Sequence, residues 1–164
     1  MSSGEGSGTS LGTVRGRDYP TLRQFTVFLE NRVGQLLDVV RRLEGSGNRI
    51  LALSVNDSAG CAFVRFLLQD PERARETLER AGLSVFESDC VGVVLPETGN
   101  PLQGICMALL QAEINIVQIY GVFGKTDEGP AVAIMVDNTE AALETLAGKG
   151  FRLLHEGDLN QDLS

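Results

Sequence analysis

The residue types best suited to covalent or metal chemistry are three cysteines and one histidine, and their spacing favours neither. Cys61, Cys90 and Cys106 form no C-x-x-C pair, and His155 has no second histidine or cysteine near it in the sequence. A zinc site needs about four such ligands together, and a nucleophilic thiol needs an adjacent base. We therefore expect reduced thiols in the core, no catalytic residue, no metal and no cofactor.

A segment that follows the first predicted strand is suited instead to holding a small zwitterion. It runs Asn31-Arg-Val-Gly34 and leads into the apolar stripe of a helix. The first turn of a helix carries backbone N–H groups without intrahelical partners, and the helix dipole favours a carboxylate there. An α-amino acid has that carboxylate, and the side-chain oxygens of Asn31 and Asn115 are suitable acceptors for its ammonium. A simpler interpretation stays open, in which Gly34 only turns the chain and Asn31 and Asn100 only cap helices.

Length and charge exclude several classes of function. The chain has 164 residues, with 22 acidic and 14 basic side chains and a net charge of −8. Nucleic-acid binding needs clustered Lys and Arg, so we expect no nucleic-acid partner. The sequence has no apolar run of about 18 residues and no apolar signal-peptide core, so we expect no membrane partner and a cytoplasmic location. The imbalance lies in residues 88–164, which carry three basic and eleven acidic groups.

The elements that position the turn follow from hydrophobic periodicity. Alternating Phe25, Val27 and Leu29 predict a strand, and apolar residues at a spacing of three and four after Val33 predict a helix. Asp70 is a typical N-cap residue and starts a second helix. The elements predicted in the first half are strands 23–29, 50–55, 61–68 and 83–86 and helices 33–45 and 70–82. Those predicted in the second half are strands 90–95, 114–123, 131–136 and 151–154 and helices 102–112 and 138–148.

The second half repeats the first. Matching residues stand 66 positions apart before the hairpin and 68 positions apart after it, and a hairpin loop absorbs the two extra residues. The pairs are Leu29/Leu95, Leu36/Leu102, Ile50/Ile116, Asp70/Asn138, Glu72/Glu140 and Gly82/Gly150. We predict an α+β fold of two ferredoxin-like βαββαβ repeats, each with an antiparallel sheet and helices on one face.

The repeats also define the expected domains. A flexible Gly/Ser-rich tail covers 1–21, the first repeat 22–87, the second repeat 88–156, and a second tail 157–164. A unit of about 60 residues buries only about 60% of the surface that its unfolded chain exposes, so we expect the uncovered sheet faces and edges to find partners.

The two candidate turns differ between the repeats. Asn100, which follows Gly99, stands where the first repeat has Gly34. Among residue types, Asn is second only to Gly in tolerating a left-handed backbone conformation. Arg49 stands where the second repeat has Asn115 and either pairs with a carboxylate or lies solvated at an edge. We therefore expect one ligand site, formed by the first turn with Asn115.

Two motifs carry a resemblance to a known family. They are Phe28-Leu-Glu-Asn-Arg-Val-Gly-Gln-Leu36 and Ala112-Glu-Ile-Asn-Ile116. With the duplicated βαββαβ unit they resemble tandem ACT-domain proteins over about residues 23–156, and the first motif is similar to the start of the acetolactate synthase regulatory small subunit. The resemblance implies an amino-acid-sensing regulatory module that binds a free amino acid at the strand 1–helix 1 turns and the domain interface. The implied site residues are Asn31, Arg32, Val33, Gly34, Gln35, Leu36, Arg49, Gly99, Asn100, Leu102 and Asn115.

These observations favour a non-catalytic amino-acid-binding regulator, acting as a homodimer or with a biosynthetic enzyme. One alternative is the regulatory small subunit of acetolactate synthase or of another biosynthetic enzyme, which requires a separate catalytic chain. Another is an interaction module without a ligand. A small hydrolase or transferase is disfavoured because no nucleophile and base stand in a recognisable arrangement.

Overall fold

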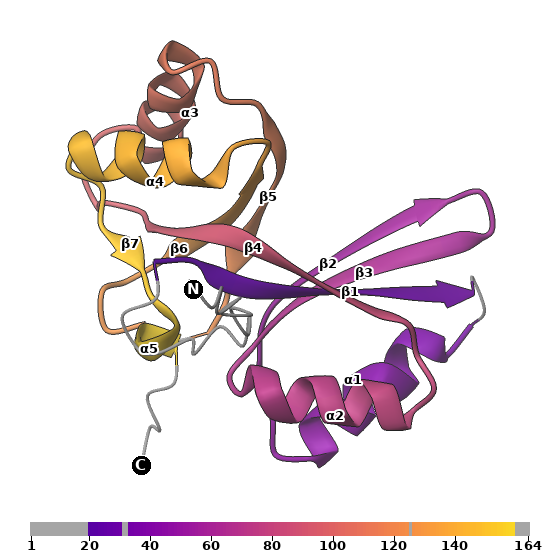
Figure 1. Cartoon of the computed structure of the whole chain (residues 1–164). Coiled ribbons are helices and arrows are strands. Elements are labelled where there is room, and N and C mark those ends of the chain that lie inside the picture. Colours follow the sequence, from indigo (N-terminus) through magenta and orange to yellow (C-terminus); the bar gives the residue numbers. More distant parts are fainter. Residues whose placement is uncertain (1–19, 31–32, 125, 160–164) are drawn as a thin grey trace, which may run out of the picture.

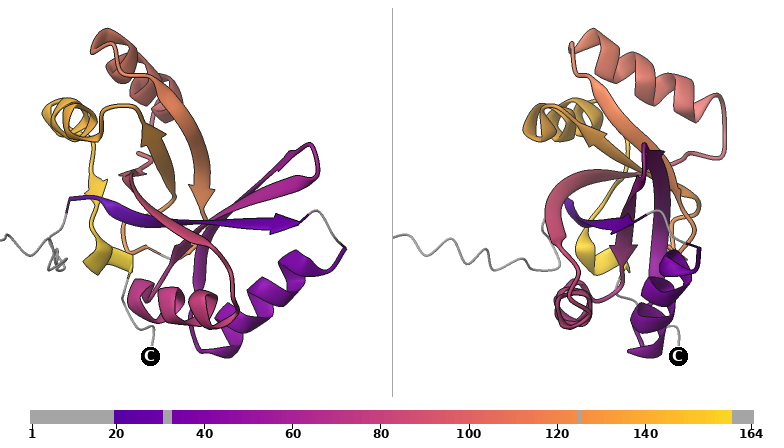
Figure 2. Two further views of the ribbon diagram at one scale, coloured as in Figure 1. Left: turned by 45° about the vertical axis from the view of Figure 1, so that its right-hand side comes forward. Right: turned by 90° about the vertical axis from the view of Figure 1, so that its right-hand side faces the viewer.

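The computed structural model describes residues 20–30, 33–124 and 126–159, and within them two antiparallel sheets lie between two pairs of helices (Figure 1). Figure 2 shows from two further sides that α1 and α2 lie at one end of the molecule and α3 and α4 at the other. The elements are β1 (Leu22–Glu30), α1 (Gln35–Gly45), β2 (Ile50–Ser58), β3 (Cys61–Leu68), α2 (Pro71–Arg80), β4 (Val85–Val94), α3 (Pro101–Gln111), β5 (Ile116–Val122), β6 (Ala131–Val136), α4 (Thr139–Gly148), β7 (Leu153–Leu154) and α5 (Glu156–Leu159).

The strand order is the same in the two repeats. The first sheet has the order β2-β3-β1-β4, and the second has the order β5-β6-β4-β7. All strand pairs are antiparallel. The predicted pair of ferredoxin-like repeats is therefore confirmed.

Strand β4 belongs to both sheets. Its first part, residues 85–90, pairs with β1, and its second part, residues 91–94, pairs with β6. The strands expected at 83–86 and 90–95 therefore form one strand, and the expected boundary at 87/88 falls inside it. The polar residues between the two expected strands have tertiary partners: Glu87 forms an ion pair with Arg75, and Ser88 accepts a hydrogen bond from Gln24 at 3.1 Å.

The sheet faces that carry no helices pack against each other. This contact explains how the uncovered faces are buried within one chain. At its edge the carbonyl of Leu51 in β2 accepts hydrogen bonds from the N–H groups of Phe123 (2.8 Å) and Gly124 (3.0 Å) after β5. The buried residues of this inter-repeat core are Leu22, Leu51, Ala52, Leu67, Cys90, Val94, Val122, Ala131, Ala133, Leu154 and Leu159.

A polar network crosses the inter-repeat core. Gln24 in β1 is completely buried. Tyr120 Oη in β5 donates to Gln24 Oε1 at 2.5 Å, and Gln24 Nε2 donates to Ser88 Oγ and lies 3.3 Å from Met135 Sδ. Because both ends of the amide have partners, its burial costs little, and it fixes the register of one sheet on the other.

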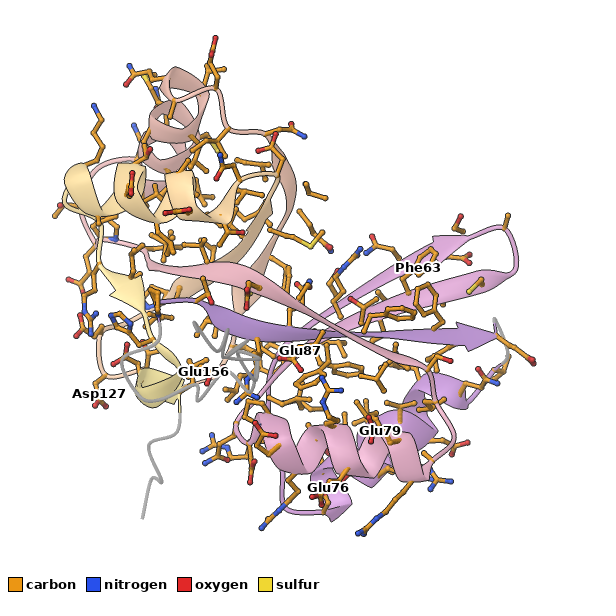
Figure 3. The ribbon with its side chains drawn as sticks, in the orientation of Figure 1. Phe63, Glu76, Glu79, Glu87, Asp127 and Glu156 are labelled. Atoms are coloured by element: carbon orange, nitrogen blue, oxygen red, sulfur yellow. The ribbon has the colours of Figure 1, made fainter. Side chains whose placement is uncertain are left out.

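The C-terminal part also joins the core. Residues 157–159, expected in a tail, belong to α5, and Leu159 is buried. Glu156 of α5 lies beside the start of β1 (Figure 3) and accepts from Arg23 Nε at 2.7 Å. The helix therefore ties the end of the second repeat to the first.

The buried Cys90 thiol in the inter-repeat core is expected to make the protein less stable at alkaline pH. Burial, with a smaller contribution from Asp89, raises the pKa of the Cys90 thiol from 9.0 to about 12, and burial also raises the pKa of Tyr120. Between about pH 9 and about pH 12 the unfolded chain releases the Cys90 proton while the folded chain keeps it, so the free energy of unfolding falls as pH rises. The free energy of unfolding, measured with urea across this pH range, is expected to fall more steeply with pH for the parent than for Cys90→Ala. Equal slopes in the two proteins would contradict this assignment.

Candidate ligand-binding site

The first turn presents an uncapped helix start. Asn31 and Arg32 lie outside the described residues. Val33 is fully exposed, and Gly34 has φ 91°, a left-handed conformation that favours glycine. Gly34 has no side chain to cap α1, and its carbonyl accepts from the N–H of Asp38 at 3.0 Å. The first N–H groups of α1 are therefore not capped by a side chain from this position.

In the second turn the residue with left-handed backbone stands one position earlier than in the first turn. Gly99 has φ 80°, whereas Asn100 has φ −116°. Our expectation that Asn100 takes the left-handed place of Gly34 is wrong, because Gly99 already reverses the chain. Asn100 precedes α3 without a capping hydrogen bond from its side chain, so the interpretation of Asn100 as a side-chain cap is also wrong. Its carbonyl accepts from the N–H of Gly104 at 3.0 Å.

Asn115 and Arg49 lie at the far ends of the helices that these turns start. Each helix has 11 residues, which is about 16 Å at 1.5 Å per residue. Exposed Arg49 follows α1, and exposed Asn115 precedes β5, where its backbone N–H donates to Asp137 Oδ1 at 3.1 Å. Within one repeat, the turn and the residue after the helix therefore do not share a site.

A hollow lies beside each of the two helices. The hollow next to α3 measures about 450 Å³ and the one next to α1 about 160 Å³. The larger hollow is lined by Asn100, Gln103, Gly104, Met107, Ala108, Gln111, Lys149 and Phe151. The smaller one is lined by Leu29, Gln35, Asp38, Val39, Arg42, Ala81 and Leu83. Asn115 lines neither of them.

The repeat correspondence explains why the two hollows differ. Gly104 stands where the first repeat has Asp38, and Ala108 stands where it has Arg42. The two small residues leave open the space that the longer side chains occupy beside α1. The charge differs as well: Lys149 of the second hollow replaces Ala81 of the first, whereas the first hollow contains both the Asp38 carboxylate and the Arg42 guanidinium.

The second hollow has the chemistry to hold an amino acid. The Lys149 ammonium and the uncapped start of α3 attract a carboxylate. The amide oxygens of Gln103 and Gln111 are acceptors for an ammonium. Met107 and the ring of Phe151 provide apolar surface for a side chain.

Of the residues expected at the site, the structure places Asn100 in the second hollow and Gln35 in the first. Leu36 packs against the buried apolar residues of the first repeat, and Leu102 is 49% exposed on α3. The sequence analysis missed Lys149 and Phe151. A position-by-position comparison of the repeats contains the signal for them, since Gly104 and Ala108 are small where the equivalent residues are large and charged.

The burial of the three cysteines agrees only in part with the expectation of core thiols. Cys90 is buried, Cys61 is half-buried, and Cys106 is exposed on α3, which corrects the expectation of three core thiols. No group of three or more His, Cys, Asp or Glu within metal-binding reach occurs among the described residues. Over the same part of the chain, every helix is too short or too polar to cross a bilayer.

The fold defines a protein built of two linked βαββαβ repeats, and the comparisons give its family. The model of the ACT domain pair matches residues 20–163, so the chain belongs to the ACT domain pair family. No curated protein sequence matches the chain.

Two of the following solved structures share this fold, and the third is a weaker match. Protein BT0572 from Bacteroides thetaiotaomicron superposes with a TM-score of 0.78 at 25% identity, covering 87% of this chain and 98% of that one. The regulatory subunit of aspartate kinase from Thermus thermophilus, in its ligand-free form, has a TM-score of 0.55 at 19% identity, covering 79% and 93%. The acetolactate synthase small subunit from Thermotoga maritima has a TM-score of 0.37 at 11% identity, covering 81% and 92%.

Proposed function

We propose that this protein is a non-catalytic regulator that binds a free amino acid in the hollow between α3 and the α4–β7 connection. The observation that carries the proposal is the contrast between the two hollows. The second is larger and has Lys149 as its charged residue, whereas the first is narrowed by Asp38 and Arg42, whose opposite charges offset each other. This assignment moves the expected site from the first turn to the second repeat.

The family supports the regulatory part of the proposal. The Thermus protein of the same fold is the regulatory subunit of an enzyme, and ACT domain pairs resemble the amino-acid-sensing modules expected from the sequence. The proposed partners are a second copy of this chain or a biosynthetic enzyme.

The lining indicates the class of amino acid. Met107 and Phe151 offer apolar contact, and the charged group of the lining is Lys149. An apolar or uncharged side chain therefore fits better than a cationic one, which would face Lys149 at close range. We propose an apolar amino acid as the ligand.

A thermal-shift screen of the twenty amino acids tests the proposal. A ligand at a hundredfold excess over its Kd stabilises the folded chain by about 2.7 kcal/mol, which raises Tm by several degrees. Gly104→Asp, which introduces the residue of the first repeat, is expected to weaken binding at least tenfold because its carboxylate repels that of the ligand. Calorimetry with the amino acid found in the screen measures this loss.

Asp38→Asn is the matched control, since it changes the charge of the other hollow and is expected to leave the affinity unchanged. No Tm shift with any amino acid at millimolar concentration would reject the regulator. A Tm shift that survives Gly104→Asp but changes with Asp38→Asn would place the site in the first repeat.

A further inference from the structure

Three phenylalanines gather on the face of the first sheet that carries no helices. Val27 and Val64 point into the core beneath α1 and α2, so their neighbours Phe28 and Phe63 point to the opposite face. The ring of Phe28 packs edge to face against Phe63, with centroids 4.9 Å apart, and against Phe86, at 5.1 Å. Phe28 is 37% exposed and Phe86 57%. We call the surface formed by Phe28, Phe63 and Phe86 the aromatic face.

The aromatic face continues the interface between the repeats but is not covered by it. Leu22 in β1 and Leu67 in β3 belong to the inter-repeat core. Phe28 stands six residues after Leu22 in β1, a distance of about 20 Å in a strand. There β1 and the β2–β3 hairpin extend beyond the second repeat (Figure 1), and Phe63 lies on the side of the sheet away from α1 and α2 (Figure 3).

The second repeat buries the same three positions. The equivalent residues, at offsets of 66 and 68, are Val94, Ala131 and Leu154. The strand register agrees, because Phe28 pairs with Phe63 as Val94 pairs with Ala131. All three equivalent residues are buried in the inter-repeat core. The first repeat therefore exposes aromatic rings at positions that the same architecture covers elsewhere, and exposed apolar surface of this kind is typical of a binding site.

Arg65 adds a positive charge beside the aromatic face. It follows Phe63 by two residues in β3, so it lies on the same face, and it is half-buried. Its buried Nε atom has no hydrogen-bond partner among the described residues, whereas Arg23 and Arg75 donate to carboxylates. The equivalent residue of the second repeat is the buried Ala133. The aromatic face is therefore complementary to an apolar group that carries a carboxylate.

Helix α5 shows which kind of segment completes such a surface. Leu159 is buried in the same core as the three equivalent residues, and Glu156, three residues earlier, accepts from Arg23 Nε at 2.7 Å. One helical turn thus presents an apolar side chain and a carboxylate on one side. The first repeat has no such segment of its own, because the residues equivalent to 156–159 are 88–91, which continue β4 into the second sheet.

We propose that the aromatic face binds a helical segment of a different protein chain, in which an apolar side chain and a carboxylate stand three residues apart. The apolar side chain packs on the three rings, and the carboxylate accepts from the Arg65 guanidinium. Aromatic residues and arginine dominate the binding energy of many protein interfaces. The proposal rests on the proposed function, since the segment belongs to the regulated partner, but it does not involve the hollow beside α3.

Selection of phage-displayed random dodecapeptides on the full chain tests the proposal. The enriched peptides are expected to carry Asp or Glu three residues from Leu, Ile, Met or Phe. Fluorescence anisotropy with an enriched peptide is expected to give a Kd at least tenfold higher for Phe86→Thr, which removes one ring of the aromatic face. Arg65→Gln is expected to weaken the dependence of Kd on salt, because it removes the charge that salt screens. Circular dichroism verifies that both variants are folded.

Phe123→Thr is the matched control. Phe123 is 64% exposed, and its N–H donates to Leu51 at the start of β2, far from the aromatic face, so the Kd is expected to stay unchanged. Failure to enrich any peptide, or equal binding by Phe86→Thr and the parent, would overturn the proposal. So would a dimer of the parent, seen by sedimentation equilibrium, that Phe86→Thr dissociates, since a second copy would then be the occupant.

The outcomes for the aromatic face and for the amino-acid site are separable. A Tm shift with an amino acid in a chain that binds no peptide would reject the aromatic face while the ligand site stands. Peptide binding that depends on Phe86, in a chain without any Tm shift, would support the aromatic face and reject the ligand site.

Discussion

Replacement of Arg23 by Ala is expected to lower the free energy of unfolding by about 3 to 5 kcal/mol, the usual cost of removing one member of a buried ion pair. Arg23 lies in β1 with 11% of its side chain exposed, and Glu156 of α5 has 10% exposed. The guanidinium donates to both carboxylate oxygens, from Nε at 2.7 Å and from Nη2 at 3.3 Å. Without it, the buried carboxylate of Glu156 loses the two hydrogen bonds that it accepts from the guanidinium. Urea unfolding followed by circular dichroism measures the loss.

Glu72 provides the matched control for this ion pair. It accepts from the same guanidinium, at 2.5 Å, but its side chain is 74% exposed. Glu72→Gln is therefore expected to cost less than about 1 kcal/mol, as exposed pairs do. The double variant Arg23→Leu with Glu156→Leu is expected to regain most of the stability lost in Arg23→Ala, since it leaves no buried charge. A loss that is equal for Arg23→Ala and Glu72→Gln would show that the burial of Glu156 is not the cause.

Gly92→Val is expected to destabilise the protein by about 3 kcal/mol through overpacking. A Cβ atom at Gly92 would lie 2.6 Å from Leu22 Cδ1 and 2.9 Å from Leu154 Cβ. Both leucines are fully buried in the inter-repeat core. The backbone cannot move away easily, because Gly92 pairs with β6 on one side and with β7 on the other. Thermal or urea unfolding measures the change.

Gly121→Val in β5 is the control for strand propensity, because no heavy atom lies within 4 Å of a Cβ at that position. Its stability is expected to stay within about 0.5 kcal/mol of the parent. If both valine variants lost the same stability, close packing around Gly92 would not be the cause.

Local patterns predicted the individual elements well because they depend on nearby residues. The expected N-caps are confirmed: Asp70 accepts from the N–H of Arg73 and Asn138 from that of Ala141, each at 3.1 Å. The spacing of the repeat predicted both sheets, since duplicated periodicity requires duplicated topology. Side-chain spacing within about four residues is enough for predictions of this kind.

Features that depend on contacts across the molecule could not be predicted in the same way. Glu87 and Ser88 fall between two separately expected strands, yet both belong to β4, where Arg75 and Gln24 are their partners. Gln24 itself has the place of a solvent-facing residue in an alternating strand, and its burial follows from the second sheet that packs on it. The partners of Glu87 and Ser88 stand 12 and 64 residues away along the chain, respectively.

The candidate site stays a prediction, and the site that we propose from the structure lies in the second repeat instead of at the first turn. The sequence indicated helix starts suited to a carboxylate, and the structure gives two such starts. The choice between them depends on the space beside each helix, which is set by residues from the α2–β4 and α4–β7 connections. Lys149 and Phe151 come from the latter, and single-sequence patterns do not relate them to α3.

Strand β4 joins the two repeats directly, with no irregular segment between its two halves. Its ten residues span about 33 Å and are hydrogen-bonded to a neighbouring strand from end to end, first in one sheet and then in the other. Bending between the repeats would break this ladder and open the core that the sheets share. We therefore expect the two repeats to move together and neither to fold alone when β4 is divided. We also expect the proposed ligand to change the outer surface of the protein and not to swing one repeat against the other.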